Sequence, residues 1–129
     1  MNRIKVTDNF YLDELVPPEI YTARRGKAIE LLDMRIVSAL QFLREKAEEK
    51  YGSDVSFVVN NWATGGNFHE SGRRLANTRT GAKWSQHKDG RALDPKPKGL
   101  TVSQLFDIAK EHERFLVDNA LLTLSLIHI

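Results

Sequence analysis

The sequence contains no cysteine, which excludes both structural disulfides and metal sites built from thiolates. It has no apolar run approaching the roughly 18 residues of a membrane-spanning helix. The N-terminal stretch MNRIKVTDNFYLDEL also lacks the apolar core of a signal peptide. These absences predict a chain made as a soluble cytoplasmic protein with no membrane partner. Any metal that it binds must be held by histidine and carboxylate side chains.

Acidic residues are scarce in one part of the chain. Residues 60–100 hold eight basic and three acidic residues, whereas the remainder holds eleven basic and fourteen acidic residues. A local positive excess indicates an anionic partner, for which nucleic acid, an acidic cell-wall polymer and a peptide with a free carboxylate all qualify. A solvated loop face explains the same charge equally well.

The 129 residues form no internal repeat and predict a single domain over 1–129. Apolar residues spaced by three and four predict a helix from Ala28 to Lys50, with Gly52 just past its end. Val16-Pro17-Pro18 is interpreted as a helix breaker.

A β-branched run, Val55–Val59, predicts a buried strand, and the Gly- and Asn-rich residues 60–83 predict a long loop. Thr101 and Gln104 form a capping box that predicts a second helix over about 102–116. This order of elements predicts an α+β fold with a small, mainly antiparallel sheet flanked by helices.

The segment from Trp84 to Asp94 carries the most specific chemistry. Asp89-Gly90 is a strong signal for a two-residue hairpin turn, which would place Ser85, His87, Ala92 and Asp94 on one face. His87 and Asp94 would then be diagonal neighbours, roughly 7 Å apart at Cα, and able to share one metal ion. Nitrogen and oxygen ligands suit a catalytic Zn²⁺, although spacing alone fits a hydrogen-bonded surface pair better.

The pattern Ser85-x-His87-x-x-Gly90-x-Ala92-x-Asp94 resembles the S-x-H-x-x-G-x-A-x-D signature of zinc D-alanyl-D-alanine carboxypeptidases and related phage endolysins. These enzymes belong to the hedgehog/DD-peptidase superfamily, whose fold the resemblance therefore implies. It further implies that His87 and Asp94 bind zinc and that Ser85 contacts the substrate.

A second segment extends the resemblance, which covers roughly residues 28–116. Ser71-Gly72-Arg73-Arg74 is similar to the family's S-G-Y-R segment, whose arginine is thought to hold the polarised carbonyl or a substrate carboxylate. By that match Arg74 is the catalytic arginine, and Arg73 is the second candidate, as a substrate-binding residue. Thr80-Gly81-Ala82-Lys83-Trp84 looks most like phage-borne members.

Family members have a third zinc ligand near the C-terminus, in a W-x-H or W-V-H-x-D segment with a nearby general base. His128 is the candidate for that ligand here, but no tryptophan precedes it and no aspartate follows it. We favour truncation: residues from about 124 onward would not be native, and the base would be missing.

The other histidines and carboxylates have weaker claims. His69, in the long loop, is an alternative ligand, whereas His112 follows the apolar stripe of the second helix and is expected at a core edge or on the surface. Nothing in the spacing of Glu113 or Asp118 supports either as a general base. Trp62 and Trp84 are interpreted as packing residues rather than substrate platforms.

Together these features predict a monomeric zinc metallopeptidase that acts in the bacterial cell wall on peptidoglycan stem peptides, with weak or no activity in this exact chain. A non-catalytic module that binds the cell wall or a protein on the same fold is the first alternative. A nucleic-acid-binding protein is the second. It is disfavoured because no nucleic-acid motif is present and the acidic remainder would repel phosphate.

Overall fold

The computed structural model describes residues 3–68, 71–73, 93 and 95–118 of the chain. Over these residues the fold is α+β, as the sequence predicts. The α-helices are α1 (Pro18–Arg24), α2 (Met34–Tyr51), α3 (Val102–Glu111) and α4 (Glu113–Asp118). The strands are β1 (Lys5–Thr7), β2 (Phe10–Tyr11), β3 (Ser56–Val58) and β4 (Lys96–Lys98). Three 3-10 helices connect them: η1 (Leu12–Glu14), η2 (Arg25–Leu31) and η3 (Trp62–Thr64).

The described strands pair into two small antiparallel sheets. β1 pairs with β2, and β3 pairs with β4 in the register Ser56↔Lys98, Phe57↔Pro97 and Val58↔Lys96. The second pairing joins strands separated by 37 residues, since β3 ends at Val58 and β4 begins at Lys96. The two ends of the segment between them therefore lie side by side, because Val58 pairs with Lys96.

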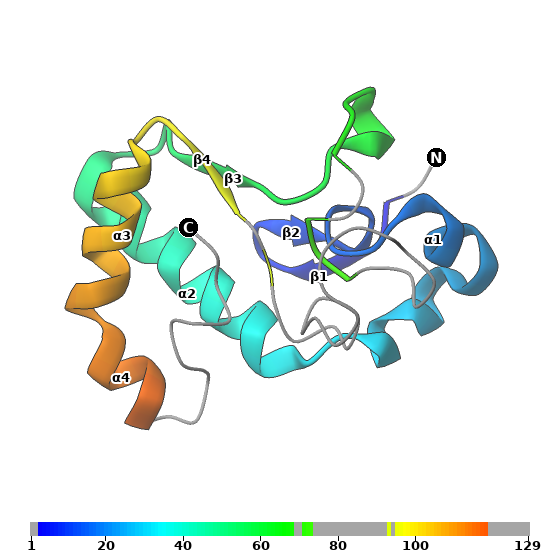
Figure 1. Ribbon diagram of the computed structural model, residues 1–129, viewed down its shortest axis with the longest axis horizontal. Coiled ribbons are helices and arrows are strands. Elements are labelled where there is room, and N and C mark those ends of the chain that lie inside the picture. The colour runs from blue at the N-terminus through cyan, green and yellow to red at the C-terminus, as the bar shows by residue number, and fades with distance from the viewer. Residues whose placement is uncertain (1–2, 69–70, 74–92, 94, 119–129) are drawn as a thin grey trace.

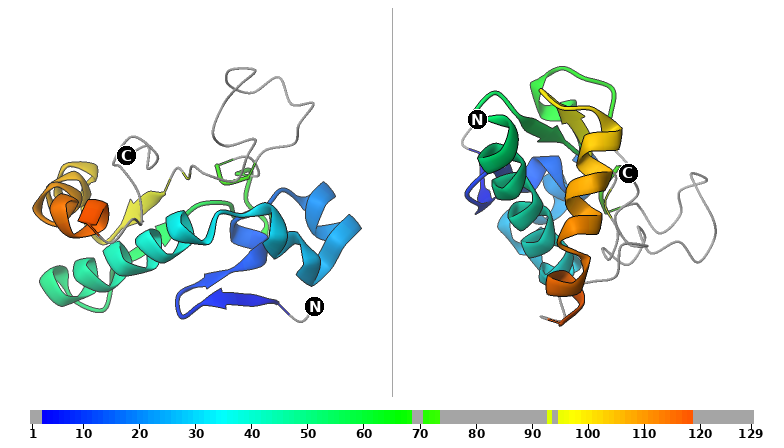
Figure 2. Two further views of the ribbon diagram at one scale, coloured as in Figure 1. Left: turned by 90° about the horizontal axis from the view of Figure 1, so that it is seen from below. Right: turned by 90° about the vertical axis from the view of Figure 1, so that its left-hand side faces the viewer.

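Helix α2 slants across one half of the molecule (Figure 1), and α3 packs beside it, as the end-on view in Figure 2 also shows. Helix α1 lies at the opposite end, and the β1–β2 hairpin lies between α1 and α2. β3 and β4 lie between α3 and this hairpin.

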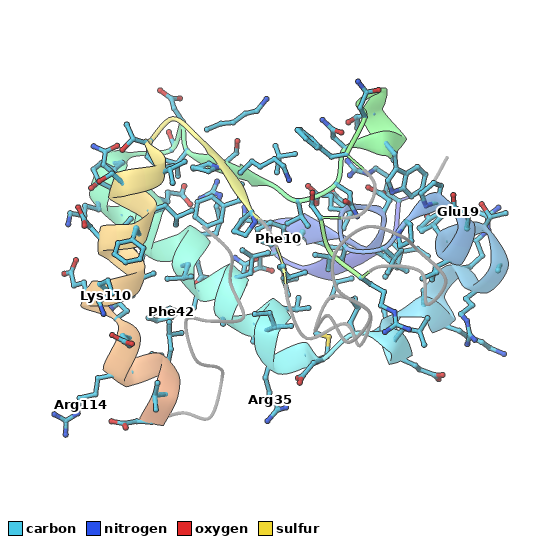
Figure 3. The ribbon with its side chains drawn as sticks, in the orientation of Figure 1. Phe10, Glu19, Arg35, Phe42, Lys110 and Arg114 are labelled. Carbon is cyan, nitrogen blue, oxygen red and sulfur yellow. The ribbon has the colours of Figure 1, made fainter. Side chains whose placement is uncertain are left out.

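A single cluster of buried apolar side chains connects these elements. Figure 3 shows Phe10 near the middle of the molecule, whereas Arg35 and Arg114 extend outward from its edge. The largest fully buried side chains come from β2, η1, α2, α3, α4 and the segments between elements; they are Phe10, Leu12, Leu15, Val16, Ile36, Leu40, Leu43, Leu93, Leu105, Ile108 and Leu116. At about 25 cal/mol per Å² of apolar area removed from water, burial of this cluster is the main force holding the elements together.

Helix α2 begins later than the sequence predicts, at Met34 rather than Ala28. The side chain of Asp33 accepts a hydrogen bond from the backbone N–H of Arg35 at 3.0 Å and so caps the first turn. Residues 25–31 instead form η2, which still directs Ala28 into the core. At the other end Gly52 is the C-cap, but its φ of +98° and ψ of 176° lie outside the left-handed helical region that a glycine after a helix is expected to adopt.

The predicted strand over Val55–Val59 is confirmed, with β3 covering its centre. Val55, Phe57 and Val59 are buried, and the two residues between them are half-buried, so the strand shows one face to the core. β4 was not predicted, because Lys96-Pro97-Lys98 has neither β-branched residues nor an apolar alternation.

The second helix starts where the capping box predicts. Thr101 Oγ1 accepts from Gln104 N at 3.0 Å, and Gln104 Oε1 accepts from Thr101 N at 2.8 Å. The single helix predicted to about residue 116 is wrong, however, since α3 ends at Glu111, with His112 as its C-cap, and α4 follows from Glu113. The apolar residues that predicted this helix still face the core from α3 and α4. They are Leu105, Ile108, Ala109 and Leu116, all of which are buried.

The proline pair near the N-terminus begins a helix and does not break one. Pro18 is the first residue of α1, and Pro17 precedes it in an extended conformation. A proline at the first helical position costs nothing, because that N–H has no partner inside the helix. Among the described residues, no helix is both long and apolar enough to cross a membrane.

Candidate functional site

Most of the residues singled out by the sequence lie outside the described part of the chain. They are His69, Arg74, Trp84, Ser85, His87, Asp94 and His128, together with the Asp89-Gly90 turn. The predicted hairpin and the separation of His87 from Asp94 therefore stay predictions. The described residues on either side of this segment, Ser71–Arg73 before it and Leu93, Pro95 and Lys96 after it, show how its two ends are held.

A hydrogen bond joins those two ends directly. Lys96, the first residue of β4, donates from Nζ to Ser71 Oγ at 2.6 Å. The same ammonium lies 3.4 Å from the carbonyl oxygen of Val59, at the end of β3, and 4.2 Å from the ring centroid of Phe68. One half-buried cation thus contacts three stretches of chain that precede the predicted motif.

Asn60 fixes the point at which the chain leaves β3. It is 2% exposed, and its Oδ1 accepts from Ser71 N at 2.9 Å while its Nδ2 donates to Val16 O at 3.3 Å. Its own backbone N–H donates to Glu14 O at 2.9 Å. A buried amide with both ends paired is a rigid link, so Ser71 is tied to the turn at residues 14–16.

Gly72 and Arg73 rest on the same turn. A Cβ built on Gly72 would overlap the carbonyl oxygen of Leu15 and lie 2.9 Å from its carbonyl carbon. The neighbouring Arg73 donates from its backbone N to Leu15 O at 2.8 Å, and its side-chain Nε is buried. The predicted substrate-binding residue Arg73 is therefore half-buried, with its backbone held by the N-terminal part of the chain.

Trp62 is a packing residue, as the sequence predicts. Its ring stacks edge-on against Tyr21 at 5.6 Å between centroids, and Nε1 donates to Val16 O at 2.9 Å. The carbonyl of Val16 consequently accepts from both Trp62 and Asn60. The exposed aromatic residue of this region is instead Phe68, which sequence reasoning did not select.

The other weighed residues lie at the far end of the fold. His112 ends α3 and is half-buried against Phe42, with ring centroids 5.3 Å apart, which confirms its place at a core edge. Glu113 is paired with Lys110 at 3.0 Å, and Asp118 lies 3.6 Å from Arg114. Figure 3 shows Phe42 near the helix pair that carries these groups.

The carboxylate of Glu14, in the turn at residues 14–16, has a raised pKa. Burial raises the pKa of Glu14, and the hydrogen bond from Tyr11 N at 2.7 Å opposes that rise only in part. Arg3 also lowers the pKa of Glu14, while Asp13 raises it. The carboxylate is already used to cap η1, so its role here is structural.

Lys96, Asn60 and Phe68 are the residues that sequence reasoning missed. The sequence carries a signal for one of them, because a lysine two positions after Asp94 lies close in the chain to a predicted metal ligand. Within the described ranges no three His, Cys, Asp or Glu side chains gather where they could hold a metal. No family model, no curated protein and no solved structure matches this chain.

Proposed function

We propose that this chain carries a zinc metallopeptidase domain that hydrolyses peptide bonds in peptidoglycan stem peptides. The observation that carries the proposal is the pattern Ser85-x-His87-x-x-Gly90-x-Ala92-x-Asp94, with five specified residue types at fixed spacing. The hedgehog/DD-peptidase fold is part of the same proposal. Its site of action would be the bacterial cell wall, where the protein would work as a monomer.

His87 and Asp94 would hold the metal, because a neutral imidazole and a carboxylate are the donors that a cysteine-free zinc site requires. When bound, zinc lowers the pKa of its water to near neutrality and polarises a carbonyl group. Arg74 would orient the scissile carbonyl and meet the negative charge that develops on its oxygen, where a fixed guanidinium is most effective. Ser85 and Arg73 would contact the substrate.

Two features of the described residues are in keeping with this proposal. Ser71-Gly72-Arg73 is held on a buried turn by several backbone contacts, as a segment that must place an arginine accurately would be. Lys96 and Ser71 join the chain before Arg74 to the chain after Asp94, which limits how far the two can separate.

The third ligand and the general base are needed for hydrolysis but not for binding of zinc by His87 and Asp94. His128 is the proposed ligand, and no carboxylate of suitable spacing follows it. We therefore expect hydrolysis by this chain to be weak or absent even where zinc binds. Zinc content is the more discriminating measurement.

The test compares the zinc content of the purified protein with that of the variant His87→Ala. His112→Ala is the matched control, because it removes an imidazole that packs on Phe42 and does not belong to the proposed zinc motif. We expect wild type and His112→Ala to retain zinc and His87→Ala to lose it, with hydrolysis of purified peptidoglycan measured alongside. Equal zinc content in wild type and His87→Ala would end the metal claim.

A binding module on the same fold is the second candidate, favoured by the local excess of basic residues over 60–100, which suits an anionic cell-wall polymer. It predicts binding to purified cell wall that persists after a chelator removes all metal. Metal-dependent hydrolysis would exclude it.

A further inference from the structure

Phe68 is an exposed aromatic residue next to the Ser71 segment. The residue is 44% exposed, whereas the nearby Trp62 is packed against the core. The Lys96 ammonium lies 4.2 Å from the ring centroid, which is within the range of a favourable cation–π contact. An exposed aromatic ring beside a cation therefore marks the surface next to the Ser71 segment.

Hydrogen bonds hold the backbone at Phe68 in place. Asn61 N donates to Phe68 O at 3.0 Å, and Phe68 N donates to the side-chain Oδ1 of Asn61 at 2.9 Å. Gly66 N also donates to Asn61 O at 2.9 Å, so the loop from Asn61 to Phe68 is closed by its own hydrogen bonds. A side chain on a backbone fixed in advance loses less entropy when a ligand packs on it than one on a free loop does.

Polar groups suited to a peptide lie beside the ring. Ser71 Oγ accepts from Lys96 Nζ, so the proton of the serine hydroxyl can be donated to a ligand oxygen. Lys96 adds a positive charge at the same place, within a stretch rich in basic residues. A carbonyl or carboxylate oxygen and a small aliphatic group match this combination of donor, charge and apolar ring.

We propose that Phe68, Ser71 and Lys96 form a binding subsite for a peptide that carries small aliphatic side chains and a free carboxylate. Taken with the proposed function, on which this assignment rests, the peptide is the stem peptide of the cell wall. Its alanyl methyl groups pack on the Phe68 ring, and its carboxylate or carbonyl oxygen meets Ser71 and Lys96.

The test uses the synthetic pentapeptide L-Ala-D-Glu-L-Lys-D-Ala-D-Ala as the probe, in the presence of a chelator so that no hydrolysis occurs. Binding to the full-length protein is measured by calorimetry. We expect Phe68→Ala to weaken binding about three- to tenfold and Phe68→Tyr to retain it, because stacking on an aromatic ring is worth that much. Lys96→Met should weaken binding and reduce its dependence on salt.

Phe106→Ala is the matched control, since Phe106 is a 50% exposed phenylalanine on α3. Its binding should equal that of wild type, and thermal melts should show that all variants fold. Absence of binding to the wild type, or equal binding by wild type and Phe68→Ala, would overturn the subsite. Phe68-dependent binding of an N-acetylglucosamine oligomer in place of the peptide would also overturn it, in favour of a sugar site.

The two proposals fail in different measurements. Loss of zinc in His87→Ala with unchanged peptide binding in Phe68→Ala would remove the subsite alone. Peptide binding that depends on Phe68, with no difference in zinc content, would retain the subsite and remove the metal.

Discussion

A single missing side-chain carbon allows the Ser71-Gly72-Arg73 segment to lie where it does. Gly72 is buried against the backbone of Leu15, and any Cβ would collide with that carbonyl group. The glycine of the S-G-x-R pattern therefore has a packing reason in this fold. Only glycine fits the space at position 72, and the positions of Ser71 and Arg73 depend on this close contact with Leu15.

We expect Gly72→Ala to destabilise the protein by about 1–3 kcal/mol, as overpacking of a tight contact does. Gly26→Ala is the matched control, because the nearest atom to its added Cβ is Ile4 Cδ1 at 4.0 Å. Urea unfolding followed by circular dichroism measures both variants. Equal midpoints for the two variants would contradict the steric account.

Glu14 makes the stability of the folded protein depend on pH. Because burial raises the pKa of Glu14 in the folded state, the folded protein holds its proton more tightly than the unfolded chain does. The stability linked to this group is fully present below the ordinary glutamate pKa. It is lost as pH rises through the raised value.

The variant Glu14→Gln keeps an oxygen to accept from Tyr11 N but cannot ionise. We expect it to melt at a higher temperature than wild type at neutral pH and at the same temperature at about pH 3, below the ordinary glutamate pKa. Thermal melts across this range measure the difference. A wild type that is the more stable protein at neutral pH would show that the hydrogen bond and Arg3 outweigh burial.

The anchoring residues of the candidate site are invisible to sequence periodicity. Asn60 and Lys96 gain their roles only when β3 pairs with β4, and that register brings together residues 38 positions apart, as in Val58↔Lys96. Phe68 likewise becomes notable only once its exposure is known. The motif around His87, by contrast, is a local pattern and can be found without any structure.

At the scale of helices and strands, the predictions succeed where local chemistry decides the outcome. The capping box at Thr101 starts α3 as expected, and the alternating burial in β3 follows its apolar residues. They fail where tertiary contacts decide: β4 has a proline between two lysines and forms only because β3 pairs with it. The start of α2 was misplaced because apolar spacing continues through η2.

The cap of α3 provides a prediction at this scale. Thr101→Ala removes the hydroxyl that accepts from Gln104 N, so we expect a loss of about 1 kcal/mol. Ser103→Ala is the matched control, because Ser103 is exposed within the same helix. Chemical denaturation compares the two variants. A cost no larger than that of Ser103→Ala would mean that the α3 packing alone fixes the start of the helix.

For the whole molecule, zinc binding and folding should be linked. A metal that binds only the folded protein stabilises it by about 2.7 kcal/mol at one hundred times its dissociation constant. We therefore expect added Zn²⁺ to raise the melting temperature of wild type and of His112→Ala, and to leave His87→Ala unchanged. Differential scanning fluorimetry measures all three. A similar rise in His87→Ala would indicate binding elsewhere.

The contacts made by the backbone carbonyls of Glu14, Leu15 and Val16 also set the boundary of the smallest piece worth expressing. A shortened protein that begins at residue 28 would keep the proposed zinc motif and helix α2. It would lose the turn at residues 14–16, against which Ser71–Arg73 packs. The proposed zinc ligands His87 and Asp94 would be present in such a piece, but the surface that holds Ser71–Arg73 would be lost. Engineers who shorten this protein should trim elsewhere.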